Sequence, residues 1–351
     1  MAVESGRARF ALGTFSYAGC APFAGLVLDP GGGAERVVAV EGLRALGAEF
    51  SVLGQGAGML DLLARWDSVL PVLQAAADRY AGAPDGRQAP VPVPIAELRV
   101  HAPVRSPQVY MSGANYFKHV VDLIVDQGPG ANPDTEGMDP TRLRAYAEAL
   151  MRKRQKEGVP YIFTKPASAI SGPFDTLEVP AWAERPDWEL ELAVVIGRPA
   201  HRVGRAEALA HVAGYTIAND ITNRDWVYAR ADMKALGTDW LRAKGLPGYL
   251  PTGPFLVPAV HAGDPRDLRI TLKLNGETKQ DESTADMIFD VARLVEHVSQ
   301  LVRLAPGDMI CTGSPAGNGT HTNRFLRTGD LMEATITGLG TQRVPVIQER
   351  S

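Results

Sequence analysis

The run Trp188-Glu-Leu-Glu-Leu-Ala-Val-Val-Ile-Gly197 places Glu189 and Glu191 in an otherwise apolar, strand-like stretch. In a strand, side chains two positions apart point to the same face, so both carboxylates are expected on one face among apolar neighbours. Burying two like charges is costly unless a cation neutralises them, and a divalent metal ion is the simplest compensation. The alternative is that both side chains lie on the solvated face of an antiparallel strand.

A third carboxylate, Asp220, closes a second strand-like run, Gly214-Tyr-Thr-Ile-Ala-Asn-Asp220. The connection between the two runs, Gly204 to Ala213, predicts a short helix that ends at Gly214, which allows the two strands to lie close together. The three carboxylates then converge. Hard oxygen ligands suit Mg²⁺, Mn²⁺ or Ca²⁺, whereas a zinc site would be expected to add Cys or His, and neither residue type occurs nearby.

From about residue 105 to the end, the chain resembles the fumarylacetoacetate hydrolase family, in particular its acylpyruvate hydrolase-like and 2-hydroxyhepta-2,4-diene-1,7-dioate isomerase-like members. Seven motifs carry this resemblance in the family's order and spacing. They are Ser112-Gly-Ala-Asn-Tyr-Phe-Lys-His119, Phe163-Thr-Lys-Pro166, Trp188-Glu-Leu-Glu-Leu192, Asn219-Asp-Ile-Thr-Asn-Arg-Asp225, Lys244-Gly245, Thr252-Gly-Pro254 and Pro306-Gly-Asp-Met-Ile-Cys-Thr-Gly-Ser-Pro315.

The resemblance implies a metal-dependent enzyme that acts on a β-diketo or 2-oxo acid. Glu189, Glu191 and Asp220 match the family's metal-binding positions, with Mg²⁺ (or Mn²⁺ or Ca²⁺) as the expected cofactor. It also implies an α+β, mainly β fold, in which a mixed β-roll catalytic domain follows a smaller N-terminal domain, and a homodimer. A metal chelated by a dicarbonyl would polarise the carbonyl under attack and stabilise the departing enolate, which is what carbon-carbon hydrolysis needs.

His119 stands at the family's histidine position, and Asp122 follows one helical turn later. That spacing predicts that the carboxylate orients the imidazole and raises its basicity, so both are candidate catalytic residues. Short family members carry Glu in place of Asp122, which changes the reach of the pair. Outside the motif, a single histidine of this kind would be interpreted as an ordinary surface residue.

Lys244 matches the family's catalytic lysine, and Arg224 matches an arginine that contacts substrate. A planar guanidinium is well suited to bidentate binding of a carboxylate, and the alternative is a surface ion pair with Asp225 or a neighbouring acid. Gly313 and Ser314 belong to a glycine-rich loop whose amides and hydroxyl can hold an oxyanion or carboxylate, and both are candidate substrate-binding residues. Ser314 replaces a frequent Thr, and Val227 replaces a frequent Gln, so we expect altered substrate contacts.

Composition is typical of a globular enzyme, with 351 residues, 45% hydrophobic and 22% charged, and a formal net charge of −4. This balance gives no reason to expect nucleic acid or a membrane surface as a partner. Cys20 and Cys311 lie far apart in sequence and predict free thiols in a reducing compartment. The N-terminus lacks the blocks of a signal peptide, and no apolar run reaches transmembrane length, so a cytoplasmic location is expected.

The sequence predicts a small α+β domain over residues 1–100 and a larger domain over 101–351. The proline-rich stretch Pro90 to Pro94 is a natural linker between them. Alternation from Leu268 to Leu274, running into Asn275-Gly276, predicts a β-hairpin. Three strands and three helices are also expected, at Arg7–Phe15, Ala24–Leu28, Arg36–Val40, Met59–Trp66, Ser68–Tyr80 and Asp290–Leu304.

Residues 120–160 form a longer insertion than the short family members have. A loop is followed by a predicted helix with Asp139 as N-cap, Pro140 at the first position and Gly158 at the end. Leu143, Tyr146, Ala147 and Leu150 are expected on its apolar face. Because the insertion leaves directly from the His119 motif, we interpret it as a lid over the substrate. The alternative is a peripheral helix that packs on a dimer partner.

These features predict a divalent-metal-dependent hydrolase that cleaves a carbon-carbon bond in an acylpyruvate-like or β-diketone substrate. One alternative is a decarboxylase, isomerase or hydratase of a 2-oxo acid on the same fold. A second alternative is a catalytically silent protein that binds oxo acids. The small-molecule oxo acid or diketone is the expected partner in each case, together with a second copy of the chain.

Overall fold

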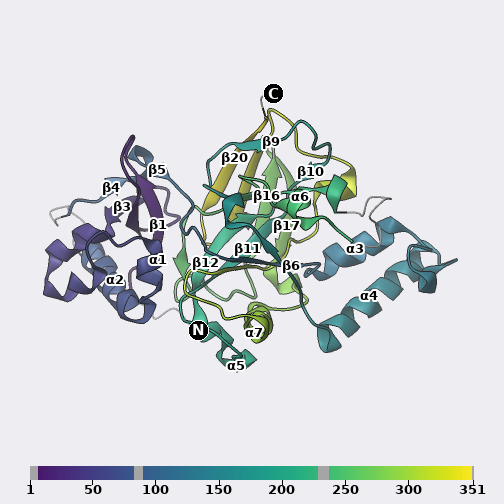
Figure 1. The fold of residues 1–351 in the computed structure, drawn as a ribbon, viewed down its shortest axis with the longest axis horizontal. Coiled ribbons are helices and arrows are strands. Elements are labelled where there is room, and N and C mark those ends of the chain that lie inside the picture. The colour runs from purple at the N-terminus through teal and green to yellow at the C-terminus, as the bar shows by residue number, and fades with distance from the viewer. Residues whose placement is uncertain (1–6, 83–89, 228–236, 350–351) are drawn as a thin grey trace.

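The computed structural model describes residues 7–82, 90–227 and 237–349. A small N-terminal domain contains a five-stranded sheet in the order β4-β3-β2-β1-β5, covered by two α-helices (purple in Figure 1). Central pairing is antiparallel, with Phe10 opposite Leu28. Its elements are β1 (Phe10–Ser16), β2 (Phe23–Leu28), β3 (Arg36–Ala39), β4 (Val93–Pro94), β5 (Arg99–Val100), α1 (Met59–Leu63) and α2 (Trp66–Ala81).

The larger domain is built on a mixed six-stranded sheet in the order β15-β12-β11-β18-β6-β7. In its centre, β11 and β12 pair antiparallel, with Leu190 opposite Asn219 and Glu191 opposite Ala218. β18 joins β11 antiparallel and β6 parallel, which closes the mixed arrangement. The strands are β6 (Val109–Gly113), β7 (Tyr161–Lys165), β11 (Leu190–Ile196), β12 (Val212–Asn219), β15 (Val257–Pro258) and β18 (Met309–Cys311).

A second five-stranded sheet, ordered β17-β16-β19-β20-β9, packs on one face of this central sheet. Short two-stranded pairings of β10 with β13 and of β14 with β8 complete the β-structure described. The remaining strands are β8 (Ile170–Ser171), β9 (Leu177–Val179), β10 (Pro186–Asp187), β13 (Thr222–Asn223), β14 (Leu250–Pro251), β16 (Arg269–Leu274), β17 (Glu277–Ser283), β19 (Leu331–Ile336) and β20 (Thr341–Gln348).

Both faces of β11 are buried, which explains why its sequence is almost continuously apolar. Leu192 and Val194 point into a core shared with the second sheet and with helix α7 (Val291–Leu301). Ala193 and Val195 point into a separate core shared with the N-terminal domain. Strand alternation assigns Glu191 to the second of these faces, inside the protein rather than on a solvated side.

Helices α3 (Phe117–Gln127) and α4 (Pro140–Glu157) pack on each other as a hairpin that projects from the central sheets (Figure 1, right). The predicted N-cap is present, because Asp139 accepts a hydrogen bond from the Arg142 backbone N–H. The buried face of α4 differs slightly from the prediction. It consists of Leu143, Ala147 and Met151, whereas Leu150 is 37% exposed. No helix in the described ranges is both long and apolar enough to cross a bilayer.

Most elements predicted from local patterns are present within a few residues, including the hairpin at Asn275-Gly276, where both residues have positive φ. One expectation was wrong in detail. Gly214 lies inside β12 instead of ending a helix, because the helical connection α5 (Arg205–Ala208) and one 3₁₀ turn end before Val212. β5 ends at Val100, while the domain division at residue 100 stays a prediction.

Replacing Gly214 by alanine is expected to destabilise the protein by about 3 kcal/mol, the upper end of the usual cost of overpacking a buried site. A Cβ there would lie 2.2 Å from the Val257 carbonyl oxygen, so the β12–β15 pairing would have to separate. Urea denaturation of G214A and of the wild type measures the loss. The matched control is Gly204→Ala, whose Cβ meets nothing within 4 Å, and a similar loss in both variants would contradict the explanation.

Candidate active site

The three predicted carboxylates lie together at one end of the β11–β12 pair. Glu189 immediately precedes β11, Glu191 is its second residue and Asp220 follows the last residue of β12. The Asp220 backbone N–H donates to the Glu189 carbonyl at 2.8 Å, which holds the two strand ends in register. Each side chain offers a ligand oxygen, and these oxygens lie within 4.8 Å of one another. Glu191 is only 2% exposed, so the alternative of a solvated face does not apply to it.

Three buried cations surround these carboxylates. Lys244 Nζ lies 2.9 Å from Glu189 Oε2 and 2.5 Å from Asp220 Oδ2. Lys165 Nζ lies 2.6 Å from Asp220 Oδ1, and Arg224 contacts Glu189 Oε1 at 2.6 Å. Arg224 does pair with neighbouring acids, Asp187 and Glu189, but its side chain is buried, so the alternative of a surface ion pair is wrong in its location.

Lys165 was not singled out as a site residue from the sequence, although it stands in the quoted motif Phe163-Thr-Lys-Pro166. It ends β7, and its Nζ also donates to the Ile221 and Tyr249 carbonyls at 3.2 and 2.6 Å. An ion pair in which both side chains are buried needs such additional hydrogen bonds to offset desolvation. The available signal in the sequence was a lysine at the end of a strand that is largely apolar or aromatic.

The carboxylates differ in their proton affinity. Burial alone would raise the pKa of Glu189, but Lys244 and Arg224 outweigh it and lower that pKa to about 2. Burial, reinforced by the charges of Asp220 and Glu189, raises the pKa of Glu191 well above its ordinary value. Lys165 and Lys244 thus neutralise part of the cluster and leave Glu191 as its least compensated member.

This imbalance fits a divalent cation. Arg224 also pairs with a fourth buried carboxylate, Asp187. Counting Asp187, four carboxylates face the three cations Lys165, Arg224 and Lys244, which is a formal excess of one negative charge. The donor set consists of carboxylate oxygens, which Mg²⁺, Mn²⁺ and Ca²⁺ prefer. The raised pKa of Glu191 indicates a site where a further positive charge would be favourable. Glu189, Glu191 and Asp220 therefore fit a divalent metal and would be the residues that hold it.

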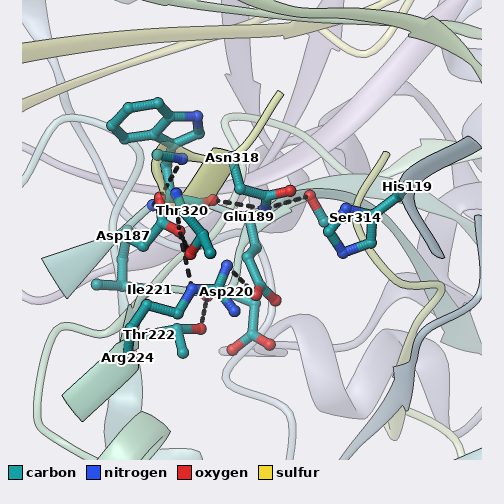
Figure 2. Close-up of polar contacts among 12 residues, drawn as sticks. His119, Asp187, Glu189, Asp220, Ile221, Thr222, Arg224, Ser314, Asn318 and Thr320 are labelled. Atoms are coloured by element: carbon teal, nitrogen blue, oxygen red, sulfur yellow. Dashed lines mark hydrogen bonds and ion pairs between the residues drawn. The ribbon is translucent and has the colours of Figure 1, made fainter. Parts of the chain in front are cut away.

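Asp187, also missed from the sequence, connects the cluster to the C-terminal loop. Its carboxylate accepts from Arg224 Nε at 2.8 Å and from the Gly319 backbone N–H at 2.7 Å. It also accepts from the Thr320 backbone N–H and hydroxyl at 3.2 and 2.9 Å. Figure 2 shows Asp187 between Arg224 and Thr320. One fully buried carboxylate therefore fixes both the arginine and the loop.

The glycine-rich loop holds a carboxylate of the protein itself. The Gly313 N–H donates to Glu191 Oε2 at 2.8 Å. Gly313 has φ +91°, and a Cβ there would lie 2.9 Å from the Ser112 carbonyl oxygen, so the close approach requires glycine. Ser314 Oγ accepts from Gln280 Nε2 at 2.9 Å.

His119 lies in the first turn of α3 and is almost completely buried. Burial, assisted by the positive charge of Arg224, lowers its pKa to about 3. The expected hydrogen bond from His119 to the Asp122 carboxylate is not found among the described residues, where Asp122 Oδ1 instead accepts from Arg144 on α4 at 2.9 Å. His119 instead forms a hydrogen bond with His321, with 3.3 Å between His119 Nδ1 and His321 Nε2.

A cavity of about 140 Å³ brings these groups together. Its polar side is formed by the acidic cluster, Arg224, Lys244, His119 and Ser314. Leu123, Phe163, Val227 and Trp240 form an apolar side, where the rings of Phe163 and Trp240 stack with 4.5 Å between centroids. All the predicted site residues except Asp122 and Gly313 line this cavity, and Gly313 reaches it through its bond to Glu191.

The family described as "Fumarylacetoacetate (FAA) hydrolase C-terminal" matches residues 108–347, more than half of the chain. The chain belongs to the fumarylacetoacetate hydrolase family. Its fold is that of the family, with mainly β sheets in a mixed α/β arrangement and a small N-terminal domain before the catalytic domain. The buried acidic cluster is consistent with the divalent-metal site typical of this family.

Among curated relatives, the mitochondrial oxaloacetate tautomerase FAHD2A of Bos taurus is 42% identical over 52% of this chain and 57% of its own length. The 2,4-didehydro-3-deoxy-L-rhamnonate hydrolase of a Sphingomonas species is 41% identical over 54% of this chain and 66% of its own length. These alignments thus span less than two thirds of either relative.

Solved structures are similar over nearly the whole chain. A fumarylacetoacetate hydrolase from Exiguobacterium antarcticum superposes with a TM-score of 0.67 at 26% identity, covering 97% of this chain and all of the other. A probable 2-hydroxyhepta-2,4-diene-1,7-dioate isomerase from Mycobacterium abscessus gives 0.66 at 29% identity, with the same coverage. Hydrolases, tautomerases and isomerases of oxo acids therefore all occur among similar proteins.

Glu191→Gln is expected to weaken Mn²⁺ binding at least about tenfold, since even the outer partners of metal ligands contribute that much. The substitution keeps the volume but removes the charge that the cluster leaves uncompensated. Isothermal titration of the purified protein with Mn²⁺ measures both affinities. Glu178→Gln, on an exposed position of β9, is the matched control, and equal affinities for wild type and E191Q would exclude the site.

Proposed function

We propose that the protein is a divalent-metal-dependent hydrolase that cleaves a carbon-carbon bond in an acylpyruvate-like or related β-diketone substrate. The main support is a single cavity in which the acidic cluster lies beside a neutral histidine and a buried arginine. A bound divalent cation would polarise a substrate carbonyl and stabilise the enolate that departs. The chain's own residues would supply binding and proton transfer.

His119 is the proposed base. With its pKa lowered to about 3, the imidazole is neutral at pH 7 and has a nitrogen lone pair that can accept a proton from water. Its place in the first turn of α3, at the positive end of the helix dipole, also favours the neutral form. A proton taken from water by His119 would be available for the carbanion that leaves.

Arg224 and Lys244 are the proposed groups for the carboxylate end of the substrate. The Arg224 guanidinium is held on one side by Asp187 and Glu189, which orients its planar fork. The Nζ of Lys244 is engaged by Glu189, Asp220 and Thr222, so it would have to exchange one of these partners to contact substrate. Ser314, which lines the cavity, remains a candidate substrate contact, whereas the Gly313 N–H would have to leave Glu191 Oε2 before it could bind substrate.

The apolar side of the cavity supports an acyl group rather than a second carboxylate at the far end of the substrate. The stacked Phe163 and Trp240, together with Leu123 and Val227, offer dispersion contacts but no hydrogen-bond donors for an anion in the described part of the chain, apart from the Trp240 indole N–H. Val227, where the family often has Gln, extends this apolar side. An acylpyruvate with a hydrocarbon chain fits this distribution.

A tautomerase or isomerase is the second candidate, since a relative named as a tautomerase is 42% identical over 52% of this chain and a structure named as a probable isomerase has a similar fold. Proton transfer between carbon and oxygen would use the same histidine without attack by water. Decarboxylation, hydration and simple binding of an oxo acid also stay open as alternatives. Homodimer formation and a cytoplasmic location stay predictions, and the similar FAHD2A protein is mitochondrial.

Wild-type protein with Mg²⁺ or Mn²⁺ is expected to convert acylpyruvates to pyruvate and a carboxylic acid, identified by mass spectrometry across a panel that includes oxaloacetate. Glu191→Ala should reduce this rate at least about a hundredfold, because the residue contributes both charge and ligand to the site. Glu178→Ala is the control. Tautomerised, decarboxylated or rearranged product without cleavage would move the function to the second candidate, and no turnover would leave a binding protein.

The α3–α4 hairpin is proposed to close over bound substrate as a lid, because α3 contributes both His119 and Leu123 to the cavity. Binding of a slow substrate or product should then increase amide protection in residues 119–137, measured by hydrogen exchange with mass spectrometry. The strands β16 and β17 serve as an internal reference. Unchanged exchange over 119–137 at saturating ligand would favour the peripheral dimer contact instead.

A further inference from the structure

A chain of hydrogen bonds runs from the cavity to the protein surface through two histidines. His119 Nδ1 lies 3.3 Å from His321 Nε2, with the two rings nearly perpendicular at 86°. His321 Nδ1 in turn lies 2.6 Å from Asp126 Oδ2. Exposure increases along this chain, since His119 is buried while the side chains of His321 and Asp126 are 14% and 55% exposed.

We propose that His321 and Asp126 are positioning residues that hold His119 as the tautomer with its proton on Nδ1, leaving Nε2 free to accept a proton in the cavity. The proposal rests on the proposed role of His119 as the base. It assigns a function to two residues that lie outside the acidic cluster. It also replaces Asp122 as the group expected to orient the histidine.

The direction of the hydrogen bonds follows from the carboxylate. An ionised Asp126 only accepts, so the proton of a neutral His321 must be on Nδ1. His321 Nε2 then carries the lone pair and accepts from His119, whose proton is therefore on Nδ1. When His119 takes a proton on Nε2, the resulting imidazolium donates its Nδ1–H towards His321, and the positive charge is stabilised through that ring by Asp126. We call His119, His321 and Asp126 the histidine relay. No covalent bond to carbon or oxygen forms between these three side chains.

This stabilisation matters because the other surroundings of His119 oppose its protonation. Burial and the charge of Arg224 lower its pKa, as do His321 when it carries a positive charge itself and Lys244, and the α3 N-terminus acts in the same direction. Of the nearby groups, Asp122 opposes this lowering, but its carboxylate is occupied by Arg144. A base with so low a pKa is a weak one, so a partner that responds only when the proton arrives would raise its effectiveness.

Two separate elements place the relay. Asp126 lies in the last turn of α3, two turns after His119, while His321 lies in the 3₁₀ turn Gly319–Thr322. That turn is fixed by Asp187, which accepts from the backbone N–H groups of Gly319 and Thr320. The same Asp187 binds Arg224 (Figure 2), so the proposed substrate arginine and the histidine relay have a common anchor.

The tautomer can be measured without turnover. Full-length protein labelled with ¹⁵N-histidine, with Mg²⁺ present, is expected to show His119 protonated on Nδ1 and bare on Nε2 in long-range ¹H–¹⁵N correlation spectra. Loss of the signal in His119→Gln assigns it among the seven histidines. In His321→Ala the His119 tautomer should change to a mixture or to the Nε2–H form, and Asp126→Asn should shift it in the same direction. A wild-type Nε2–H form, or an unchanged tautomer in both variants, would overturn the proposal.

Kinetics provide the second readout on any substrate that the wild type converts. Asp126→Asn should lower kcat by roughly tenfold with KM and Mn²⁺ affinity unchanged, and His321→Ala by up to about a hundredfold. Asp134→Asn removes the same charge from an exposed position of the same hairpin and should leave kcat unaltered. Wild-type kcat in both relay variants would overturn the proposal. Absence of wild-type turnover would count against the proposed function alone, because the tautomer measurement still tests the relay.

Discussion

The burial of Glu189, Glu191 and Asp220 between two apolar faces is the constraint on which the rest of the site depends. Carboxylates at the end of a sheet that is covered on both sides lose most of their hydration, so the fold has to supply positive charge. It does so from separate elements, since Lys165 ends β7 and Lys244 ends α6 (Trp240–Lys244). These lysines leave one of the three carboxylates uncompensated, which is consistent with a divalent-metal site.

Asp187 transmits this constraint to the C-terminal loop. Its carboxylate is completely buried and binds Arg224 together with the backbone of Gly319 and Thr320. Removing the charge of a buried residue with this many partners would leave several donors unsatisfied at once. Arg224 and the turn that carries His321 are therefore expected to keep their mutual arrangement, whatever happens in the more exposed hairpin.

Local patterns predicted much of this, because they act over a few residues. Alternation located Glu191 in a buried strand, and the turn residues Asn275-Gly276 located a hairpin. Partners far apart in sequence left no such signal. The spacing of three residues predicts that Asp122 orients His119, but Arg144 on helix α4 donates a hydrogen bond to the Asp122 carboxylate instead. His321 is 202 residues from His119, and only the packing of the C-terminal loop against α3 brings them together. Lys165 belongs to the motif Phe163-Thr-Lys-Pro166, but its ion pair with Asp220 could not be predicted without knowing that the end of β7 lies beside Asp220.

The cavity divides its tasks between two parts of the fold. Groups that hold charge, Glu189, Glu191, Asp220 and Lys244, are anchored to the central sheet or to the short helix packed against it, where strand pairing fixes their positions. The proposed base His119 and the proposed positioning residue Asp126 lie on α3, which projects from the sheets together with its hairpin partner α4 (Figure 1). Hydrolysis and tautomerisation require the same enolate stabilisation and differ in whether water or substrate carbon meets the base. If His119 is the base, the position of α3 is therefore the feature that would select between the two reactions, while the proposed metal site would be needed for both.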